Sequence, residues 1–355
     1  MTAAGVLPAQ AIRALVASGA VAADPAVAPG QVQPASLDLR LGPTAYRIRA
    51  SFLPGAGRRV TERLPDFAMH AIDLTEGAAL ETGCVYLVPL IERLALPEGV
   101  SGAANAKSST GRLDLFTRVI ADGGTEFDRV EAGYDGPLYA EICPRTFSVL
   151  ARAGERLTQI RFRQGRPRLT AEQRRRLHGA AGREAGLPFS VDLAGAGGPV
   201  GWRARPHSGL IDLAKLDHYD PAAFWDPVRL GPGRGVILDP GAFYILASRE
   251  SVTVPEDCAA EMAPYLAVMG EFRVHYAGFF DPGFGVAAAG GEGARAVLEV
   301  RCHEAPFALE HGQEVGRLVY EPMLERPDIL YGVEIGSTYQ AQGLRLSKHF
   351  RSPAG

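Results

Sequence analysis

The sequence predicts a mainly β protein in which one domain occurs twice in tandem. The first observation is an internal repeat of 158 residues, which relates Tyr86 to Tyr244, and Glu141 to Glu299 (299 − 141). A period this long indicates two copies of a domain rather than a solenoid of short repeats. The second observation is a series of short β-like segments separated by turns, in a chain with 42 Gly and 26 Pro. Such a pattern is typical of sandwich or barrel-like β domains.

The expected elements follow from local patterns. Residues 7–19 are expected to form a short helix, because Pro8 suits a first helical turn and Gly19 suits a helix end. A strand is expected within 31–42, where leucines alternate with polar residues. The later strands are expected at 84–91, 115–121, 137–142, 157–163, 242–248, 272–277, 296–301 and 315–320.

The repeat is interrupted at 165–209, where Thr170 and Gln173 form a capping box at the start of a basic helical stretch. We place the boundary between the copies near 205–215. This choice predicts two domains, which are residues 1–209 and residues 210–355.

Composition excludes several classes of protein. A chain of 355 residues, 46% apolar and 22% charged, can form two globular cores. Its net charge of −3 gives no global attraction for polyanions, and the arginines at 174–176 have no interleaved aromatic residues, so we expect no nucleic-acid partner. No apolar run approaches ~18 residues, so we expect no membrane partner. No secretory signal pattern opens the chain, which favours a cytoplasmic location.

The cysteines and histidines give no metal framework. The four cysteines stand far apart without a CxxC pair, which fits a reducing compartment. The eight histidines include no HExxH and no HxE followed by PCxxC. The sequence therefore gives no support for zinc-activated water, and we expect no zinc cofactor.

The segment Lys107 to Arg112, KSSTGR, occurs in the first copy only. Hydroxyl groups and backbone N–H groups in a tight turn can bind a phosphate, and a nearby arginine adds a planar cationic fork. The segment is not a Walker loop, because the glycine and lysine stand at the wrong positions. By spacing alone, an ordinary polar surface turn is the simpler interpretation.

Glu141 stands in a predicted strand, where it shares a face with Tyr139 and Cys143. An acid flanked in this way could line a partly closed site and exchange protons with water. The pattern alone favours a solvent-facing residue instead, and the same holds for its repeat partner Glu299. A tail that contains Tyr339, Gln342, Ser347 and Lys348 could fold over a phosphate chain, although tails are more often frayed.

Together these segments resemble the dCTP deaminase branch of the dUTPase-like superfamily. QVQPASLDLRLG (31–42) is similar to its N-terminal signature, and KSSTGRLDLFTRVIA (107–121) is similar to its phosphate-binding segment. GYDGPLYAEI (133–142) resembles the next segment of the family, and Glu141 within it matches the catalytic glutamate. In the second copy, AGFFDPGFG (277–285) resembles the turn before that strand, and TYQAQGLRLSK (338–348) resembles the nucleotide-covering tail.

The resemblance implies site residues and partners. The implied catalytic residues are Glu141 and Glu299, and the implied substrate-binding residues are Ser108, Ser109, Arg112, Ala121, Asp281, Tyr339, Gln342 and Lys348. The family fold is a β-sandwich or jelly-roll-like domain that trimerises with sites between subunits, so a trimer of two-domain chains is implied. The second copy lacks the serines and the arginine, which leaves open whether a site is built within copy one or from copies of different subunits.

The implied reaction is hydrolytic deamination of dCTP to dUTP and ammonia, a step toward dTTP synthesis, with Mg²⁺ on the triphosphate and dTTP as a candidate regulator. One alternative is a dUTP diphosphatase or an enzyme that performs both steps, in which Asp128 or Asp281 would orient water. The tail lacks the glycine-rich, aromatic motif of that branch. A second alternative is a nucleotide-binding module without catalysis.

Overall fold

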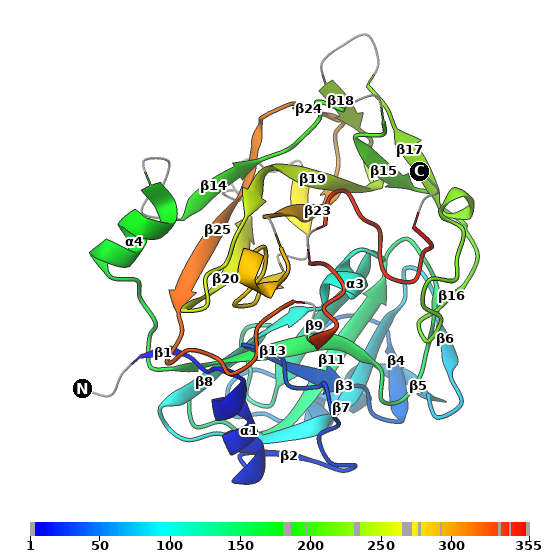
Figure 1. Cartoon of the computed structure of the whole chain (residues 1–355). Coiled ribbons are helices and arrows are strands. Elements are labelled where there is room, and N and C mark those ends of the chain that lie inside the picture. The colour runs from blue at the N-terminus through cyan, green and yellow to red at the C-terminus, as the bar shows by residue number, and fades with distance from the viewer. Residues whose placement is uncertain are drawn as a thin grey trace. The chain divides into compact units, whose positions relative to one another are not determined.

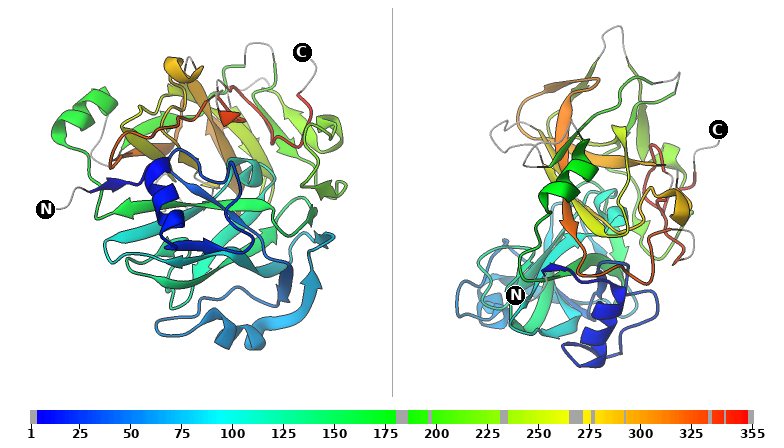
Figure 2. Two further views of the ribbon diagram at one scale, coloured as in Figure 1. Left: turned by 60° about the horizontal axis from the view of Figure 1, so that its bottom comes forward. Right: turned by 60° about the vertical axis from the view of Figure 1, so that its left-hand side comes forward.

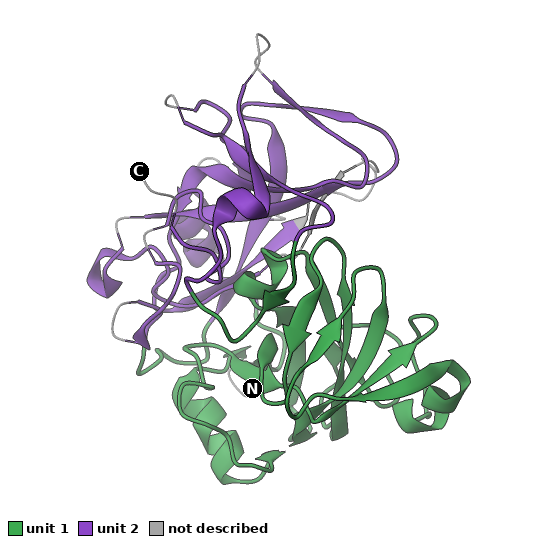
Figure 3. Cartoon of the chain, turned by 90° about the vertical axis from the view of Figure 1, so that its right-hand side faces the viewer, with its two compact units in different colours: residues 1–167, 209–216, 323–329 green, residues 168–208, 217–322, 330–355 purple. Residues whose placement is uncertain are grey.

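The computed structural model describes residues 4–179, 186–195, 198–230, 235–264, 272–275, 278–291, 293–332, 335–340 and 342–352. Strands make up 43% and helices 12%, which confirms the mainly β fold. The chain forms two compact units (Figures 1 and 3). Unit 1 contains residues 1–167, 209–216 and 323–329, and unit 2 contains residues 168–208, 217–322 and 330–355. Among the described residues, every helix is too short or too polar to span a bilayer.

Unit 1 is built from short strands with three helices. Its helices are α1 (Ala9–Ala17), α2 (Val60–Phe67) and α3 (Ser108–Gly111). Its strands are β1 (Gly5–Val6), β2 (Val21–Ala23), β3 (Leu37–Arg40), β4 (Thr44–Ile48), β5 (Ala68–Asp73), β6 (Ala78–Leu80), β7 (Val85–Ala95), β8 (Val100–Ala106), β9 (Leu115–Ala121), β10 (Arg129–Val130), β11 (Asp135–Pro144), β12 (Val149–Ala151), β13 (Arg156–Gln164) and β16 (Ile211–Asp212).

Three sheets organise unit 1. One has the order β5-β4-β7-β11-β9, with β2 also paired to β7. The second has the order β1-β13-β8-β10, with β3 paired to β13, and the third has the order β16-β12-β6. Helix α2 and the exposed strand β5 lie at the outer edge of this unit (Figure 2).

Unit 2 has one α-helix, α4 (Ala171–His178), and two 3₁₀ turns, η2 (Pro221–Ala223) and η4 (Ala287–Ala289). Its strands are β14 (Leu187–Ser190), β15 (Gly201–Ala204), β17 (Trp225–Val228), β18 (Gly235–Leu238), β19 (Phe243–Val252), β20 (Cys258–Pro264), β21 (Phe272–His275), β22 (Phe279–Phe280), β23 (Ala294–Cys302), β24 (Phe307–Glu310) and β25 (Glu314–Pro322). Their sheets have the orders β17-β15-β19-β23-β21, β14-β25-β20-β22 and β18-β24.

The two units repeat the same sheet plan. Strands β7, β8 and β13 begin at residues 85, 100 and 156, and β19, β20 and β25 begin 158 residues later, at 243, 258 and 314. The order β4-β7-β11-β9 in unit 1 matches the order β15-β19-β23-β21 in unit 2. The tandem duplication that the sequence predicts is therefore present in the topology.

A tyrosine near the start of β7, and another near the start of β19, show the repeat at the level of side chains. The Tyr86 hydroxyl accepts a hydrogen bond from the Glu81 backbone at 3.0 Å, and the Tyr244 hydroxyl accepts one from the Asp239 backbone at 2.9 Å. An arginine guanidinium lies over each ring, at 5.8 Å and 6.0 Å from the centroid. The duplication has kept this local structure in both copies.

The chain divides near residue 168, and not near residue 210 as the sequence analysis expected. Strand β14 pairs with β25, and β15 pairs with β19, so the segment 168–208 supplies strands to the second copy. The later segment 209–216 belongs to unit 1 through β16, which pairs with β12. The boundary was misplaced because β14 and β15 carry none of the residues repeated at the 158-residue spacing.

The other expected elements are present with small shifts at their ends. The capping box of α4 forms between Thr170 and Gln173, and α1 covers the middle of the helix expected at 7–19. All four residues of β3 are buried, including the polar Asp38 and Arg40, where the pattern indicated alternation. The expected strand end at 276–277 lies outside the described residues.

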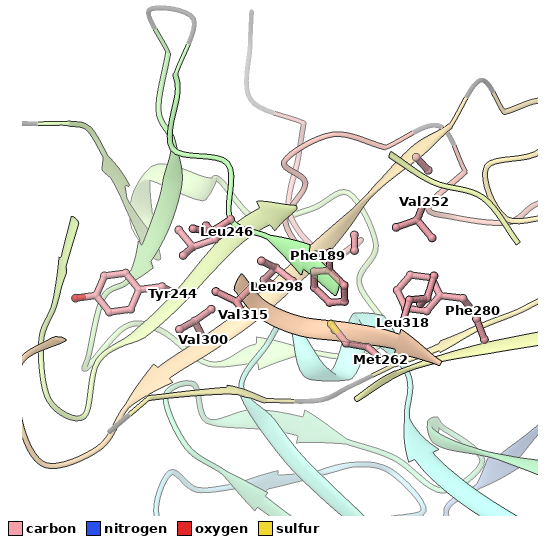
Figure 4. Packing of buried hydrophobic residues seen from close by; sticks show 14 of the residues in the cluster. Phe189, Tyr244, Leu246, Val252, Met262, Phe280, Leu298, Val300, Val315 and Leu318 are labelled. Atoms are coloured by element: carbon pink, nitrogen blue, oxygen red, sulfur yellow. The ribbon is translucent and has the colours of Figure 1, made fainter. Parts of the chain in front are cut away.

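Each unit has its own apolar packing. Unit 2 contains a core of residues from several strands, including Phe189, Tyr244, Leu246, Leu298 and Leu318 (Figure 4). In β23 the even-numbered residues 296, 298, 300 and 302 belong to this core. Strand alternation then directs the odd-numbered residues of β23, including Glu299, to the opposite face.

Candidate active site

Glu141 occupies the middle of β11 in unit 1. It pairs with Arg118 of β9 on one side and with Leu87 of β7 on the other. Its side chain is 2% exposed, so the solvent-facing alternative is wrong. Tyr139 and Cys143 share its face and are also buried. Burial raises the pKa of Tyr139 to about 12 and raises the pKa of Cys143 above its ordinary value, so both stay neutral near pH 7.

Arg118, which was not among the residues predicted from the sequence, forms the ion pair with Glu141. Its Nε donates to Glu141 Oε1 at 3.2 Å, and its Nη2 donates to the same oxygen at 2.5 Å. Its guanidinium lies 3.4 Å from the ring centroid of Phe127 and 4.7 Å from that of Phe116. Nη2 also donates to the Ser51 hydroxyl at 3.0 Å. Glu141 is therefore held in an ion pair whose cation is fixed by aromatic stacking.

The strand face that carries Glu141 is filled by apolar side chains. Ile120 and Tyr139 from β9 and β11 pack there with Leu87, and the connection 49–67 contributes Phe52 and Val60. Within the described residues, the second carboxylate oxygen of Glu141, Oε2, is buried without a hydrogen-bond partner. A buried oxygen of this kind costs about 1–3 kcal/mol unless a water or a ligand group satisfies it.

The turn expected to bind phosphate forms the one-turn helix α3. Lys107 precedes it with extended backbone, and the N–H groups of Thr110 and Gly111 donate to the Lys107 carbonyl at 2.8 Å and 3.0 Å. Ser109 and Arg112 are buried and Ser108 is partly exposed. The burial of Ser109 and Arg112 distinguishes this segment from an ordinary polar surface turn.

A buried polar network connects this turn to the N-terminal signature. The Lys107 ammonium forms an ion pair with Asp38 on β3, and the side chain of Asp38 is 2% exposed. Gln31 donates to Glu92 at 2.6 Å and to the Asp38 carbonyl at 2.7 Å. Arg40 also donates to Glu92, from Nε and from its backbone, both at 2.7 Å. The polar residues at 31–40 therefore hold Lys107, which precedes the turn at Ser108.

The strand register defines how the turn and Glu141 are related. Leu115, three residues after Arg112, pairs with Pro144, and Arg118 pairs with Glu141. Three residues of strand correspond to roughly 10 Å, so Glu141 lies about that far along the sheet from the strand end nearest the turn. Ala121 pairs with Leu138. Its side chain therefore lies on the opposite face from Glu141, and the structure does not bring these two side chains together.

Asp128 supports the connection between β9 and β11. It has φ of 62°, and its carboxylate accepts from the Val119 backbone at 2.7 Å. Its carbonyl accepts from Ala104, as the Gly278 carbonyl does from Met262 in unit 2. The segment 131–133 begins three residues after Asp128, and Asp281-Pro282-Gly283 begins three residues after Gly278. The two segments therefore correspond. The first copy thus has Glu-Ala-Gly at the turn where the second has Asp-Pro-Gly.

Glu299 occupies the corresponding place on β23 in unit 2. It pairs with Ile245 of β19 and with His275 of β21, and it is 3% exposed, so a solvent-facing role is wrong here too. Asp281 is also buried and follows β22. Unit 2 therefore contains both acidic residues that the resemblance assigned to the second copy.

The C-terminal tail is ordered within unit 2, and the alternative of a frayed tail is wrong for the described part. Gln342 donates to the Arg295 carbonyl at 3.1 Å, and the Arg295 N–H donates to the Gln342 carbonyl at 3.0 Å. Because Arg295 lies at the start of β23, the tail is attached to the strand that carries Glu299. Tyr339 accepts from the Lys348 backbone at 3.2 Å. Lys348 is partly exposed.

The family comparisons cover almost the whole chain. Residues 3–166 match the family model of the 2'-deoxycytidine 5'-triphosphate deaminase (DCD) N-terminal domain, and residues 159–350 match that of the C-terminal domain. The chain is 30% identical over 141 residues to the "dCTP deaminase, dUMP-forming" of Pseudarthrobacter chlorophenolicus, which is 38% of this chain and 70% of that protein. It is also 30% identical over 163 residues to the protein of the same name from Corynebacterium glutamicum, 44% and 77% respectively.

A solved structure matches the complete fold. The crystal structure of 2'-deoxycytidine 5'-triphosphate deaminase from Agrobacterium tumefaciens aligns with a TM-score of 0.87 and 53% sequence identity. The alignment covers 92% of this chain and 100% of that one. The tandem arrangement is thus shared with a protein of known fold and not confined to this sequence.

Proposed function

Because the chain belongs to the dCTP deaminase family, we propose that it catalyses the hydrolytic deamination of dCTP to dUTP and ammonia. The observation that supports this most is a buried glutamate on an interior strand of each copy, which the sequence resemblance matches to the family's catalytic glutamate. Two buried carboxylates at equivalent positions are unusual unless they are paired or used, because an ionised carboxylate is costly to bury.

The proposed reaction needs one carboxylate and one water. The carboxylate takes a proton from water as the oxygen adds to C4 of cytosine, and that proton passes to the ring nitrogen. The C4–N4 bond then breaks as the remaining proton of the added hydroxyl passes to the amine, which leaves as ammonia, and the oxygen stays on C4 as the carbonyl of uracil. General acid–base catalysis of this kind contributes about 10²–10⁴-fold.

We propose that Ser108, Ser109 and Arg112 bind the triphosphate, which arrives with Mg²⁺ on its oxygens. The buried guanidinium of Arg112 offers a planar fork for two phosphate oxygens. Binding energy from this non-reacting end of the substrate would position the base for attack, which accounts for a triphosphate requirement. Asp281, Tyr339, Gln342 and Lys348 are the proposed contacts of the loop and the tail, and Ala121 would contribute its backbone.

We assign the acid–base role to Glu299 rather than to Glu141. Glu141 lies beside the permanent cation of Arg118, on a strand face filled by apolar side chains. Glu299 lies on the strand to which the tail is attached, in the unit that also contains Asp281. The unpartnered Oε2 of Glu141 keeps that residue as the second candidate.

The test is incubation of the purified protein with dCTP and Mg²⁺, with ammonia and pyrophosphate measured in the same reaction. Ammonia without pyrophosphate supports the proposal as stated. Equal ammonia and pyrophosphate would indicate the dUMP-forming reaction, which the names of the Pseudarthrobacter and Corynebacterium relatives favour. Tight dCTP binding without ammonia would indicate a non-catalytic nucleotide-binding protein and refute the proposal.

The assembly and the regulation are also proposals. We propose a trimer of two-domain chains, which the mass of the native protein in light scattering tests against the monomer mass of 37.7 kDa. Inhibition by dTTP would give feedback on a reaction that supplies its precursor, and a titration of dTTP against a fixed dCTP concentration tests it. A role in the deoxynucleotide pool would place the enzyme in the cytoplasm.

A further inference from the structure

One side chain in the tail, Gln340, forms hydrogen bonds with backbone groups of several segments of unit 2. Its Oε1 accepts from the Gly285 N–H at 3.0 Å. Its Nε2 donates to the carbonyls of Gly283 and Ala289, both at 3.1 Å, and lies 3.4 Å from the Tyr331 carbonyl. Every one of these partners is a backbone group, so the amide joins segments of the chain and not individual side chains.

The segments that Gln340 joins carry the proposed substrate contacts of unit 2. Gly283 and Gly285 belong to the turn that begins at Asp281, and Ala289 ends the 3₁₀ turn η4. Tyr331 precedes the tail, and its hydroxyl accepts from the Tyr339 N–H at 3.2 Å. Gln340 itself stands between Tyr339 and Gln342 in the sequence.

The glycines of the turn explain why an amide can reach these groups. Gly283 has φ of 100° and Gly285 has φ of 70°, a region that side chains other than glycine rarely adopt. A Cβ on Gly291 would lie 3.1 Å from Gln340 Nε2. The loop therefore gives the Gln340 amide close access to its backbone.

We infer that Gln340 is a positioning residue for the proposed reaction, which holds the Asp281 turn and the tail in one fixed arrangement. This inference rests on the proposed function. Glutamine fits the position because it presents an acceptor and two donors in one plane. A side chain that cannot donate would release the Gly283 and Ala289 carbonyls and loosen the tail.

The test compares two variants with a matched control in the full-length protein. Gln340→Met removes all of the hydrogen bonds, whereas Gln340→Glu keeps an acceptor for Gly285 and removes the donor. The control is Gln313→Met, since Gln313 Oε1 accepts a single 3.2 Å bond from Glu310 in a turn of the same unit. Two assays are run. Steady-state kinetics with dCTP give KM and kcat, and limited proteolysis without nucleotide gives the rate of trypsin cleavage after the exposed Arg345.

We expect both Gln340 variants to raise KM about tenfold, with kcat within about threefold, and to speed cleavage after Arg345 about tenfold. The Gln313→Met control should leave KM and the cleavage rate unchanged. If both Gln340 variants have the wild-type KM and the wild-type cleavage rate, the inference is overturned. Faster cleavage with unchanged KM would overturn the link to substrate, and a raised KM with unchanged cleavage would indicate direct contact instead of positioning. If the wild-type protein releases no ammonia from dCTP, the proposed function fails, while the cleavage rates still show whether Gln340 holds the tail.

Discussion

The two copies share a framework but differ around their buried glutamates, Glu141 on β11 and Glu299 on β23. In both copies, a buried tyrosine hydroxyl accepts a hydrogen bond from the backbone N–H five residues earlier in the chain. An arginine guanidinium lies over the ring of the same tyrosine. Across from Glu141 the neighbouring strand carries Arg118, whereas across from Glu299 it carries His275. An arginine in that place is a permanent cation, so it fixes the first glutamate as half of an ion pair.

The connections next to these strands also differ between the two copies. In unit 1 the connection from β4 to β5 contributes Phe52 and Val60 to the cluster on the face of Glu141. The corresponding connection of the second copy, from β15 to β17, includes residues 209–216, which belong to unit 1 instead. Tyr219 and Phe224 of that connection remain in unit 2, with their rings 6.3 Å and 5.4 Å from that of Phe350 in the tail. After the duplication, the two copies kept the same strands, whereas the connections that pack against those strands diverged.

The largest expected effect separates the two glutamates. Glu299→Gln should lower kcat for deamination by at least about 100-fold, because the amide cannot take a proton from water. The matched variant Glu141→Gln should keep the wild-type rate within about threefold. Ammonia release under saturating dCTP measures both. The reverse ranking would break the comparison and move the acid–base role to copy one.

The next effect is on stability and concerns Arg118. Arg118→Met should lower the free energy of unfolding by about 2 kcal/mol, because it leaves a buried carboxylate without its cation. The value is set below the cost for a fully buried pair because the Arg118 side chain is 24% exposed. Denaturant unfolding of the variant against wild type measures it.

The double variant Arg118→Met with Glu141→Gln serves as the control for that measurement. Removing the charge of the carboxylate should restore part of the lost stability. A single variant as stable as wild type would show that the ion pair does not stabilise unit 1. In that case the difference between the copies would need another cause.

A smaller effect tests the proposed phosphate contacts of the KSSTGR segment, a sequence that occurs in the first copy only. Arg112→Lys should weaken dCTP binding about tenfold, or about 1.4 kcal/mol, because a point charge replaces a planar fork. Calorimetric titration with dCTP and Mg²⁺ measures the dissociation constant. The control is Arg129→Lys, an exposed arginine paired with Glu126 and Glu131. Equal constants for wild type and Arg112→Lys would remove Arg112 from the site.

The smallest effect is a pH dependence confined to unit 2. Desolvation, followed by repulsion from Arg174, lowers the pKa of His178 below its ordinary value of 6.5. The folded state therefore favours the neutral ring, and its stabilising contribution is complete above pH 6.5 and is lost as the pH falls through the lowered pKa. His178→Phe should reduce the loss of thermal stability between pH 7.5 and pH 5. An identical loss in wild type and variant would count against this assignment.

Much of the framework was predictable because alternation and turn residues are local signals. The strands around Glu141 and Glu299, the capping box at Thr170 and the polar turn at Ser108 were all expected from a few neighbouring residues. Arg118 was not, since its pairing with Glu141 depends on strand register across a long connection, which no local pattern determines. A search for arginine or histidine on the strand next to each glutamate would have found it.

The predicted domain boundary was misplaced for a related reason. The segment 168–208 pairs with strands more than 40 residues away, and 209–216 returns to the other unit. Long-range pairing of this kind leaves no signal in a single sequence. The burial of the tail was equally hidden, because Gln342 donates to the backbone carbonyl of Arg295, 47 residues earlier in the chain. The Tyr339 N–H donates to the Tyr331 hydroxyl, a contact that no local pattern indicates.

The most direct test is the crystal structure of the Glu299→Gln variant with dCTP and Mg²⁺. The variant should bind intact substrate, because the triphosphate contacts remain and turnover is blocked. We predict that the side chain at position 299 lies within hydrogen-bond distance of the C4 amine of cytosine, with Glu141 still paired to Arg118. A structure in which Glu141 instead contacts the cytosine ring would contradict the account.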